Sequence, residues 1–192
     1  ASDVQISNDG NSLYFKMKGY VENDSERRDG NIWVSKRVKE KWTKARMLPK
    51  AVNSQLNEYY PIITNSKNIY FSREHKDTSY DIYVYKDVGG KYQKAEKLPE
   101  YINTDLLESD AYVSPDETFM IFVRMYEEGG LGVSDLYICY KENGVWSIPK
   151  NMKSINSKGV DGSPFVTADG NYLFFTSTRD SENPEIFDGH LD

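Results

Sequence analysis

Short apolar and aromatic runs recur along the chain at a nearly constant interval. Each run ends in a phenylalanine, and the successive spacings of these phenylalanines are 56, 51 and 53 residues. The four runs are Leu13-Tyr14-Phe15, Ile69-Tyr70-Phe71, Met120-Ile121-Phe122 and Leu173-Phe174-Phe175. A fixed period of this size is typical of repeat architectures, so we expect about four copies of one structural unit.

Two further series of short motifs keep the same register. One follows the first runs and comprises Ile32-Trp33-Val34, Ile82-Tyr83-Val84, Leu136-Tyr137-Ile138 and the shorter Ile186-Phe187. The other closes the unit and comprises Val52-Asn53-Ser54, Ile102-Asn103-Thr104 and Ile155-Asn156-Ser157. Runs rich in β-branched and aromatic residues, bounded by Gly, Pro, Asn and Asp, are typical of strands joined by tight turns.

The second unit shows the expected strand pattern most clearly, with runs at 61–64, 68–72, 81–85 and 91–94. The pairs Asp9-Gly10, Pro115-Asp116 and Asp169-Gly170 lie between the first two runs of their units and predict hairpin turns. No segment of helical length carries apolar residues at helical spacing. The sequence therefore predicts an all-β chain made of four-stranded antiparallel meanders.

A four-stranded unit repeated at this interval predicts a β-propeller. The units fall approximately at 1–57, 58–107, 108–160 and 161–192, and the last unit shows only three of its four runs. We expect a single propeller domain or a fragment of one. The incomplete last unit favours part of a five- to seven-bladed ring, with blades or an adjoining domain upstream of Ala1, over four blades that close imperfectly.

Three stretches carry a resemblance to a known repeat: Ser163-Pro164-Phe165-Val166-Thr167-Ala168-Asp169-Gly170, Tyr80-Asp81-Ile82-Tyr83 and Asn143-Gly144-Val145-Trp146-Ser147-Ile148-Pro149. They resemble the WD-repeat-like β-propellers of the TolB type, and the match extends over nearly the whole chain. The second unit departs from the pattern with Asn65-Ser66 at the turn, and the third has Glu117 in place of the turn glycine. The resemblance implies a propeller and a periplasmic, secreted or cell-surface location, since such propellers occur in the bacterial envelope and as parts of larger chains.

Composition narrows the function classes. The formal net charge of −6 argues against a nucleic-acid partner, which requires basic patches. The longest apolar runs are far too short for a transmembrane segment. A single cysteine, Cys139, excludes an internal disulfide framework. The chain begins at Ala1 without an apolar leader, so we expect its start to be processed, truncated or engineered.

The loops that join one unit to the next carry the candidate binding residues. In a propeller these loops share a face with the loops between second and third strands, so acids here are expected to surround the central opening, with arginines nearby. The acids are Glu58, Glu108, Asp110 and Asp161, and the basic residues that follow the second strands are Lys16, Arg73, Arg124 and Arg179. The alternative is structural, because acids beside arginine often form pairs that only hold a loop in place.

One segment breaks the repeat. Residues 17–29 are longer and more charged than their counterparts, and loops on a rigid scaffold carry recognition. Its candidates for partner contact are Glu22, Asp24, Glu26, Arg27 and Arg28, although the polar composition favours a solvated loop over a contact site.

No metal site or cofactor is expected. Asp81, Asp135 and Glu185 precede third strands in different units, where we expect hydrogen bonds at the start of the strand rather than calcium binding. His75 and His190 lack companions at ligand spacing and are interpreted as surface residues.

These patterns favour a noncatalytic binding or scaffold module of the bacterial envelope that recognises a protein, peptide or glycan through one face of the ring. The alternative is a glycoside hydrolase of the sialidase or five-bladed type, with carboxylates around the central pocket. Its Ser-x-Asp-x-Gly-x-x-Trp box is only imitated by Ser7-Asn8-Asp9-Gly10. A peptidase-gating propeller would need a hydrolase domain with a Gly-x-Ser-x-Gly element, which the chain lacks.

Overall fold

The structure is a computed structural model that describes residues 1–18, 29–76 and 79–181. All of the regular secondary structure within these ranges is strand, which confirms the all-β prediction. The chain divides into two compact units, Ala1–Leu98 and Pro99–Asp192, and each is described by itself. No helix in the described ranges has the length and apolar character needed to cross a membrane.

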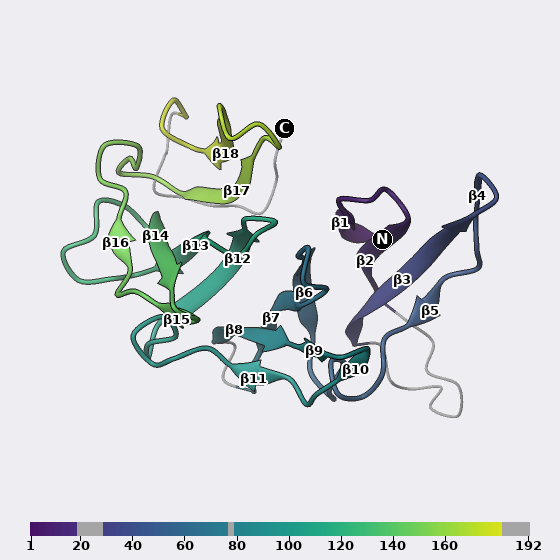
Figure 1. The fold of residues 1–192 in the computed structure, drawn as a ribbon. Coiled ribbons are helices and arrows are strands. Elements are labelled where there is room, and N and C mark those ends of the chain that lie inside the picture. Colours follow the sequence, from purple (N-terminus) through teal and green to yellow (C-terminus); the bar gives the residue numbers. More distant parts are fainter. Residues whose placement is uncertain (19–28, 77–78, 182–192) are drawn as a thin grey trace. The chain divides into compact units, whose positions relative to one another are not determined.

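The first unit contains two antiparallel sheets (Figure 1). The first sheet consists of β1 (Ser2–Ile6), β2 (Ser12–Lys18), β3 (Gly30–Val38) and β4 (Lys41–Trp42), and β5 (Arg46–Met47) also pairs with β3. The second consists of β6 (Glu58–Ile63), β7 (Ile69–Glu74), β8 (Tyr80–Tyr85) and β11 (Glu96–Lys97). A separate hairpin is formed by β9 (Asp87–Val88) and β10 (Lys91–Tyr92).

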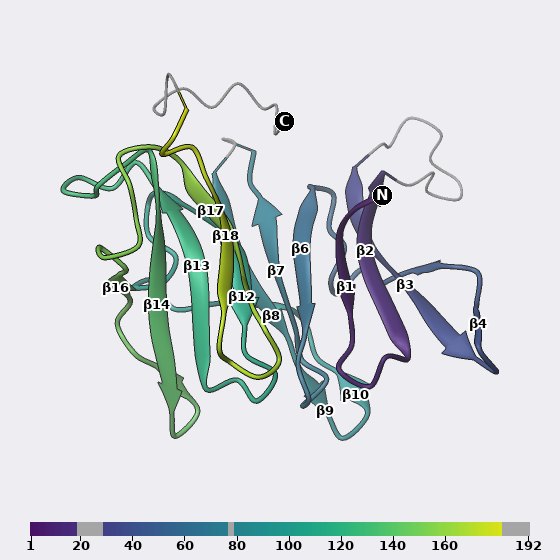
Figure 2. The ribbon, with the colours of Figure 1, turned by 90° about the horizontal axis from the view of Figure 1, so that it is seen from above.

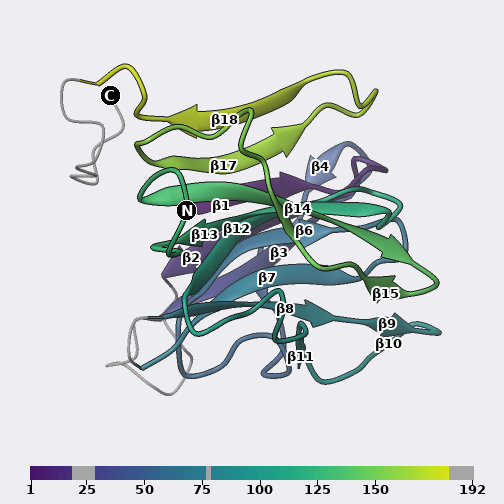
Figure 3. The ribbon, with the colours of Figure 1, turned by 90° about the vertical axis from the view of Figure 1, so that its left-hand side faces the viewer.

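The second unit repeats this plan, and its longest strands run side by side (Figure 3). Its larger sheet consists of β12 (Leu107–Val113), β13 (Phe119–Met125), β14 (Ser134–Glu142) and β15 (Val145–Trp146), and β16 (Lys150–Asn151) also pairs with β14. Its smaller sheet is the hairpin of β17 (Asp161–Val166) and β18 (Leu173–Ser177). Four meander-like sheets that follow one another along the chain are the blades of a partial β-propeller, as the repeat predicts.

The fourth strand of the second sheet was predicted at the wrong place. The run at 91–94 does not join the sheet: β10 pairs with β9 across Gly89 and Gly90, whose φ angles of 62° and 80° permit a tight turn. The strand that pairs with β8 is β11, a few residues later. In the first and third sheets the same stretch is also divided, since β4 and β15 extend the tip of the third strand while β5 and β16 pair with its body.

Each unit has its own apolar core between its two sheets. In the first unit Ile32, Ile69 and Phe71 are fully or almost fully buried in one cluster. In the second unit Leu136 and Ile121 from the third sheet pack with Val166 from β17. The apolar runs of the repeat therefore fill the spaces between neighbouring blades, which explains why they are consecutive rather than strictly alternating.

The hairpin turns between first and second strands follow the predicted chemistry. Gly10 and Gly170 have φ angles of 70° and 71°. Glu117, which stands in place of a turn glycine, adopts the same region with φ of 60°, and Lys67 does so in the second sheet with φ of 64°. Both departures from the repeat pattern thus keep the turn geometry, at the cost of strain in a non-glycine residue.

Candidate functional site

The predicted acids and arginines form three separate acid–arginine clusters at the start of the first strands. The first contains Ser54, Glu58 and Arg73; the second contains Thr104, Glu108 and Arg124; the third contains Ser157, Asp161 and Arg179. The guanidinium-to-carboxylate distances are 3.0, 2.8 and 3.2 Å in this order, and all three carboxylate side chains are fully buried. One arrangement is therefore built three times from equivalent positions.

Each carboxylate also fastens the loop that precedes its strand. The hydroxyl group four residues earlier donates a hydrogen bond to it, at 2.6 Å in the first two clusters and 2.9 Å in the third. The backbone N–H of the same Ser or Thr donates to the carboxylate as well. A Ser/Thr-x-x-x-Glu/Asp pattern followed by a distant Arg is thus the sequence signature of the cluster.

The arginines complete the connection by donating to backbone carbonyls. Arg73 donates to the carbonyl of Val52, and Arg179 donates to that of Ile155 at 2.7 Å. The guanidinium of Arg124 also lies over the ring of Tyr137, 4.7 Å from the ring centroid. These contacts join the first two strands of a sheet to the loop before them, so the clusters hold that loop against the blade.

Burial raises the pKa of the carboxyl group in the first two clusters. Desolvation raises the pKa of the Glu58 and Glu108 carboxyls, while hydrogen bonds from Ser54 or Thr104 and the charge of the arginine act in the opposite direction. The Oε2 atom of Glu58 is buried without a hydrogen-bond partner. A buried carboxylate engaged in this way is suited to positioning a loop.

The structure separates the remaining sequence candidates from these clusters. Asp110 is half-buried, two residues beyond Glu108, and accepts a hydrogen bond at 3.2 Å from the hydroxyl of Ser163. The first cluster belongs to one unit and the second and third belong to the other, so the structure does not test whether all the predicted acids surround one central opening. The partner-contact candidates Glu22, Asp24, Glu26, Arg27 and Arg28 lie outside the described residues, as do Glu185 and His190.

Each first strand contains a β-bulge that the sequence did not reveal. The register with the second strand shifts between Ser2 and Gln5, Tyr59 and Ile62, Ser109 and Tyr112, and Gly162 and Phe165. One non-glycine residue in each bulge has a positive φ of about 50°: Asp3, Tyr60, Asp110 and Ser163. Such residues cost about 1–3 kcal/mol each and are concentrated at functional sites, where bulges redirect side chains.

In the second sheet the bulge supports a group of aromatic side chains, which we call the tyrosine cluster: Tyr59, Tyr60 and Tyr80. The ring of Tyr59 stacks on Tyr60 with centroids 6.0 Å apart and meets Tyr80 edge-on at 5.5 Å. The ammonium group of Lys16 lies 3.3 Å from the centroid of Tyr59. All four side chains are half-buried, so part of this aromatic and cationic surface remains accessible.

Hydrogen bonds fix the tyrosine cluster in place. The hydroxyl of Tyr59 donates to the carboxylate of Glu74 at 3.2 Å, and Asn57 donates to the same oxygen. Burial raises the pKa of Tyr59, and desolvation lowers the pKa of Lys16. Sequence analysis missed this cluster. The available signal was the pair of adjacent tyrosines, Tyr59-Tyr60, at the position that Ser109-Asp110 and Gly162-Ser163 occupy in the other bulges.

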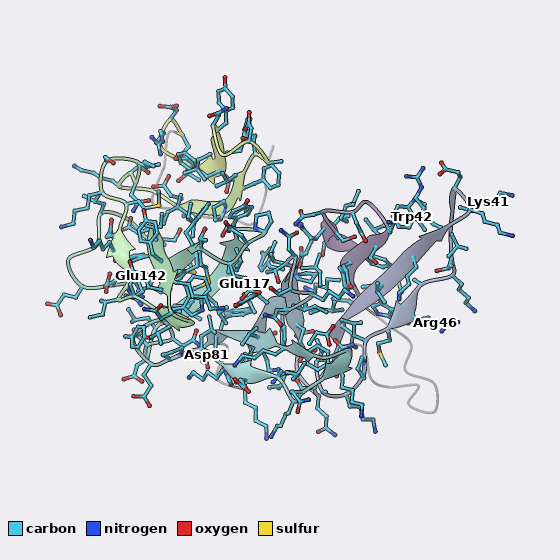
Figure 4. All side chains as sticks on the ribbon, in the orientation of Figure 1. Lys41, Trp42, Arg46, Asp81, Glu117 and Glu142 are labelled. Atoms are coloured by element: carbon cyan, nitrogen blue, oxygen red, sulfur yellow. The ribbon has the colours of Figure 1, made fainter. Side chains whose placement is uncertain are left out.

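The two described third-strand acids, Asp81 and Asp135, form hydrogen bonds near the start of their strands as expected. Asp81, labelled in Figure 4, lies 2.6 Å from Nε2 of His75 and 2.8 Å from the ammonium group of Lys97. Asp135 accepts hydrogen bonds from the backbone N–H groups of Leu131 and Gly132. His75 is half-buried and paired rather than an isolated surface residue, which corrects that interpretation. Within the described ranges no group of three metal-ligating side chains lies together.

Comparison with known proteins supports the fold alone. No family model and no curated protein sequence matches the chain. Among solved structures, TolB from Acinetobacter baumannii resembles it with 15% sequence identity and a TM-score of 0.55. The match covers 89% of this chain and 36% of TolB, so the chain spans about a third of the length of that protein.

Proposed function

We propose that this chain is a noncatalytic binding module that recognises a protein, peptide or glycan through the loop face of its blades. The tyrosine cluster carries this proposal. Tyrosine presents a large amphipathic surface at little entropic cost, which suits recognition of peptides and sugars. Here Tyr59 and Tyr60 lie at a strained bulge, and the half-buried Tyr80 and Lys16 pack against the ring of Tyr59.

The acid–arginine clusters fit a binding role better than hydrolysis. A glycoside hydrolase needs one carboxyl group that gives up a proton and another that attacks or activates water. Glu58, Glu108 and Asp161 instead each accept hydrogen bonds from an arginine and from a loop hydroxyl, and all are fully buried. We propose that these clusters hold the binding face, and that Asp110 and the charged residues of the 17–29 segment contact the partner.

An envelope location is part of the proposal. Its support is the repeat resemblance to propellers found there and the fold likeness to TolB from Acinetobacter baumannii. We also propose that the four blades belong to a larger ring of five to seven blades, completed by blades upstream of Ala1.

The experiment is affinity capture with matched tyrosine variants. The chain is immobilised, exposed separately to membrane and peptidoglycan fractions of its source organism, and the retained material is identified by mass spectrometry. A Tyr60→Ala/Tyr80→Ala variant should lose the retained partner, whereas Tyr140→Ala, an exposed tyrosine on β14, should keep it. Equal retention by all three proteins would contradict the assigned surface, and turnover of a retained glycan would contradict the noncatalytic role.

A further inference from the structure

A groove of about 420 Å³ lies in the first unit at the opposite ends of the strands from the tyrosine cluster. Its walls are the turn between β1 and β2, the turn between β6 and β7, and the end of β3. Figure 2 shows the two turns at the same ends of their hairpins. The amide of Asn8 donates to that of Asn65 at 2.7 Å and joins the two turns. The volume falls within the range of small-molecule sites.

The lining combines basic and hydroxyl-rich chemistry. Three basic residues, Lys36, Arg37 and Lys67, and one acidic residue, Asp9, line the groove. The carboxylate of Asp9 is already occupied by the hydroxyl of Ser7 at 2.6 Å and the backbone N–H of Asn11. Six hydroxyl or amide side chains also line the groove: Ser7, Asn8, Asn11, Ser12, Thr64 and Asn65. The local charge is therefore positive although the net charge of the chain is −6.

The third sheet holds a larger side chain at one of these positions. Ser12 begins β2 opposite Lys36, and its counterpart Phe119 begins β13 opposite Tyr140. The ring of Phe119 packs against Tyr112 with centroids 6.0 Å apart, so a large side chain fills the place that Ser12 leaves open. The hollow in the first unit thus follows from small polar residues at repeat positions where an aromatic residue fits.

The basic groups differ from their counterparts as well. In the third sheet Lys141, the counterpart of Arg37, is held 2.5 Å from the buried carboxylate of Glu117. Glu117 is labelled in Figure 4. The first sheet has Gly10 at the position of Glu117, so Arg37 pairs only with the highly exposed Glu40, and Lys36 forms no ion pair with the described residues. An exposed pair of this kind contributes little and can exchange for a ligand.

We propose that this groove binds a small saccharide that carries a carboxylate or phosphate group. Lys36 and Arg37 contact the anionic group, and the Ser, Thr and Asn side chains hydrogen-bond to the hydroxyls of the sugar. Tyr14 and Ile63, both buried, form the floor. This site is separate from the loop face and does not depend on the function proposed for that face.

The test is a titration of the 15N-labelled full chain, followed by backbone amide NMR at fixed ionic strength. Glucuronate and glucose 6-phosphate are the probes, while glucose and inorganic phosphate are the controls. We expect either anionic sugar to shift the amides of residues 7–12, 36–38 and 64–67, with a dissociation constant in the millimolar range. The sugar that binds more tightly identifies the anionic group.

Two variants test the two halves of the site. Lys36→Gln/Arg37→Gln should weaken binding at least about tenfold by removing the charge-assisted bonds. Ser12→Phe should block the groove as Phe119 does, without changing the charge. Lys86→Gln is the matched control. Lys86 follows Tyr85 in the second sheet at the position where Lys36 follows Ser35 in the first, but its ammonium group pairs with Glu96. The NMR spectrum of each variant reports whether it is folded.

Four results would overturn the proposal. They are an absence of shifts in the groove through the millimolar range, equal binding of glucose, equal binding of inorganic phosphate, and unchanged binding by both groove variants.

Discussion

At the scale of single residues, the three acid–arginine clusters share one geometry but differ in solvent access. The side chain of Arg124 is 6% exposed, whereas that of Arg179 is 38% exposed. Water can reach a vacated site beside Asp161 more easily than one beside Glu108. Because an unpaired buried charge is strongly unfavourable, the same substitution should have different consequences in the two clusters.

We expect Arg124→Met to reduce the free energy of unfolding by about 3–5 kcal/mol, the usual effect of leaving a buried charge without its partner. Arg179→Met should cost clearly less, because the carboxylate of Asp161 gains water when the exposed guanidinium is removed. Urea denaturation followed by tryptophan fluorescence measures both. An equal loss of stability in the two variants would contradict the role assigned to burial.

The raised pKa of Glu108 predicts a pH dependence of known sign. The Glu108 carboxyl of the unfolded chain loses its proton near pH 4.5, whereas that of the folded chain loses it at a higher pH. The contribution of this group to folding stability therefore decreases as the pH rises from the unfolded pKa through the folded pKa. The stability of the wild type relative to Glu108→Gln should therefore fall with rising pH and then level off. Urea midpoints from pH 4.5 to 8 measure the difference. A difference that grows with pH would show that the arginine charge outweighs burial.

At the scale of elements, the hairpin turns at the ends of the third strands adopt the same backbone conformation with different residues. The hairpin between β3 and β4 places Lys39 and Glu40 at φ of 48° and 65°, and the counterpart hairpin between β14 and β15 places Asn143 and Gly144 at 50° and 81°. Two consecutive positive φ angles favour Asn-Gly. The first hairpin therefore carries strain that the third sheet avoids.

We expect Lys39→Asn/Glu40→Gly to stabilise the first sheet by about 1–2 kcal/mol, because the turn residues then suit the left-handed region. The lost ion pair between Arg37 and Glu40 is exposed and subtracts little. The reciprocal variant, Asn143→Lys/Gly144→Glu, should destabilise the chain by a similar amount. Thermal and urea unfolding of both proteins check the prediction, and a loss of stability in the first variant would refute it.

Sequence alone predicted these elements unevenly. The period and the turn pairs located the first three strands of the first three blades and the first two strands of the fourth, because apolar runs and Asp-Gly turns depend on local chemistry. The fourth strand was misplaced at 91–94, since Gly89-Gly90 lets that stretch pair locally. The bulges at Tyr60 and Asp110 depend on cross-strand register, and the tyrosine cluster needs Lys16 from another sheet, so neither follows from spacing along one strand.

At the scale of the molecule, the repeat identifies which sheet faces are built to be covered. In the third sheet Tyr112 and Ile121 face each other across β12 and β13 and are only 8% and 3% exposed. They lie in the core that Val166 helps to close. Their counterparts on the last hairpin, Phe165 and Phe174, form the equivalent cross-strand pair but are 50% and 59% exposed. The aromatic pair therefore has the chemistry of a blade interface.

We expect the 192-residue chain to self-associate through this face at high concentration, because exposed apolar patches of this kind favour contact with another protein surface. Sedimentation velocity should show a concentration-dependent increase in mass that Phe165→Thr/Phe174→Thr abolishes. Ile148→Thr, which changes a more exposed apolar residue in a loop, is the control and should leave association unchanged. If a longer chain that carries additional blades remains monomeric under the same conditions, the face is covered within the ring. A monomeric 192-residue chain at all concentrations would instead show that the exposed pair is tolerated as a free surface.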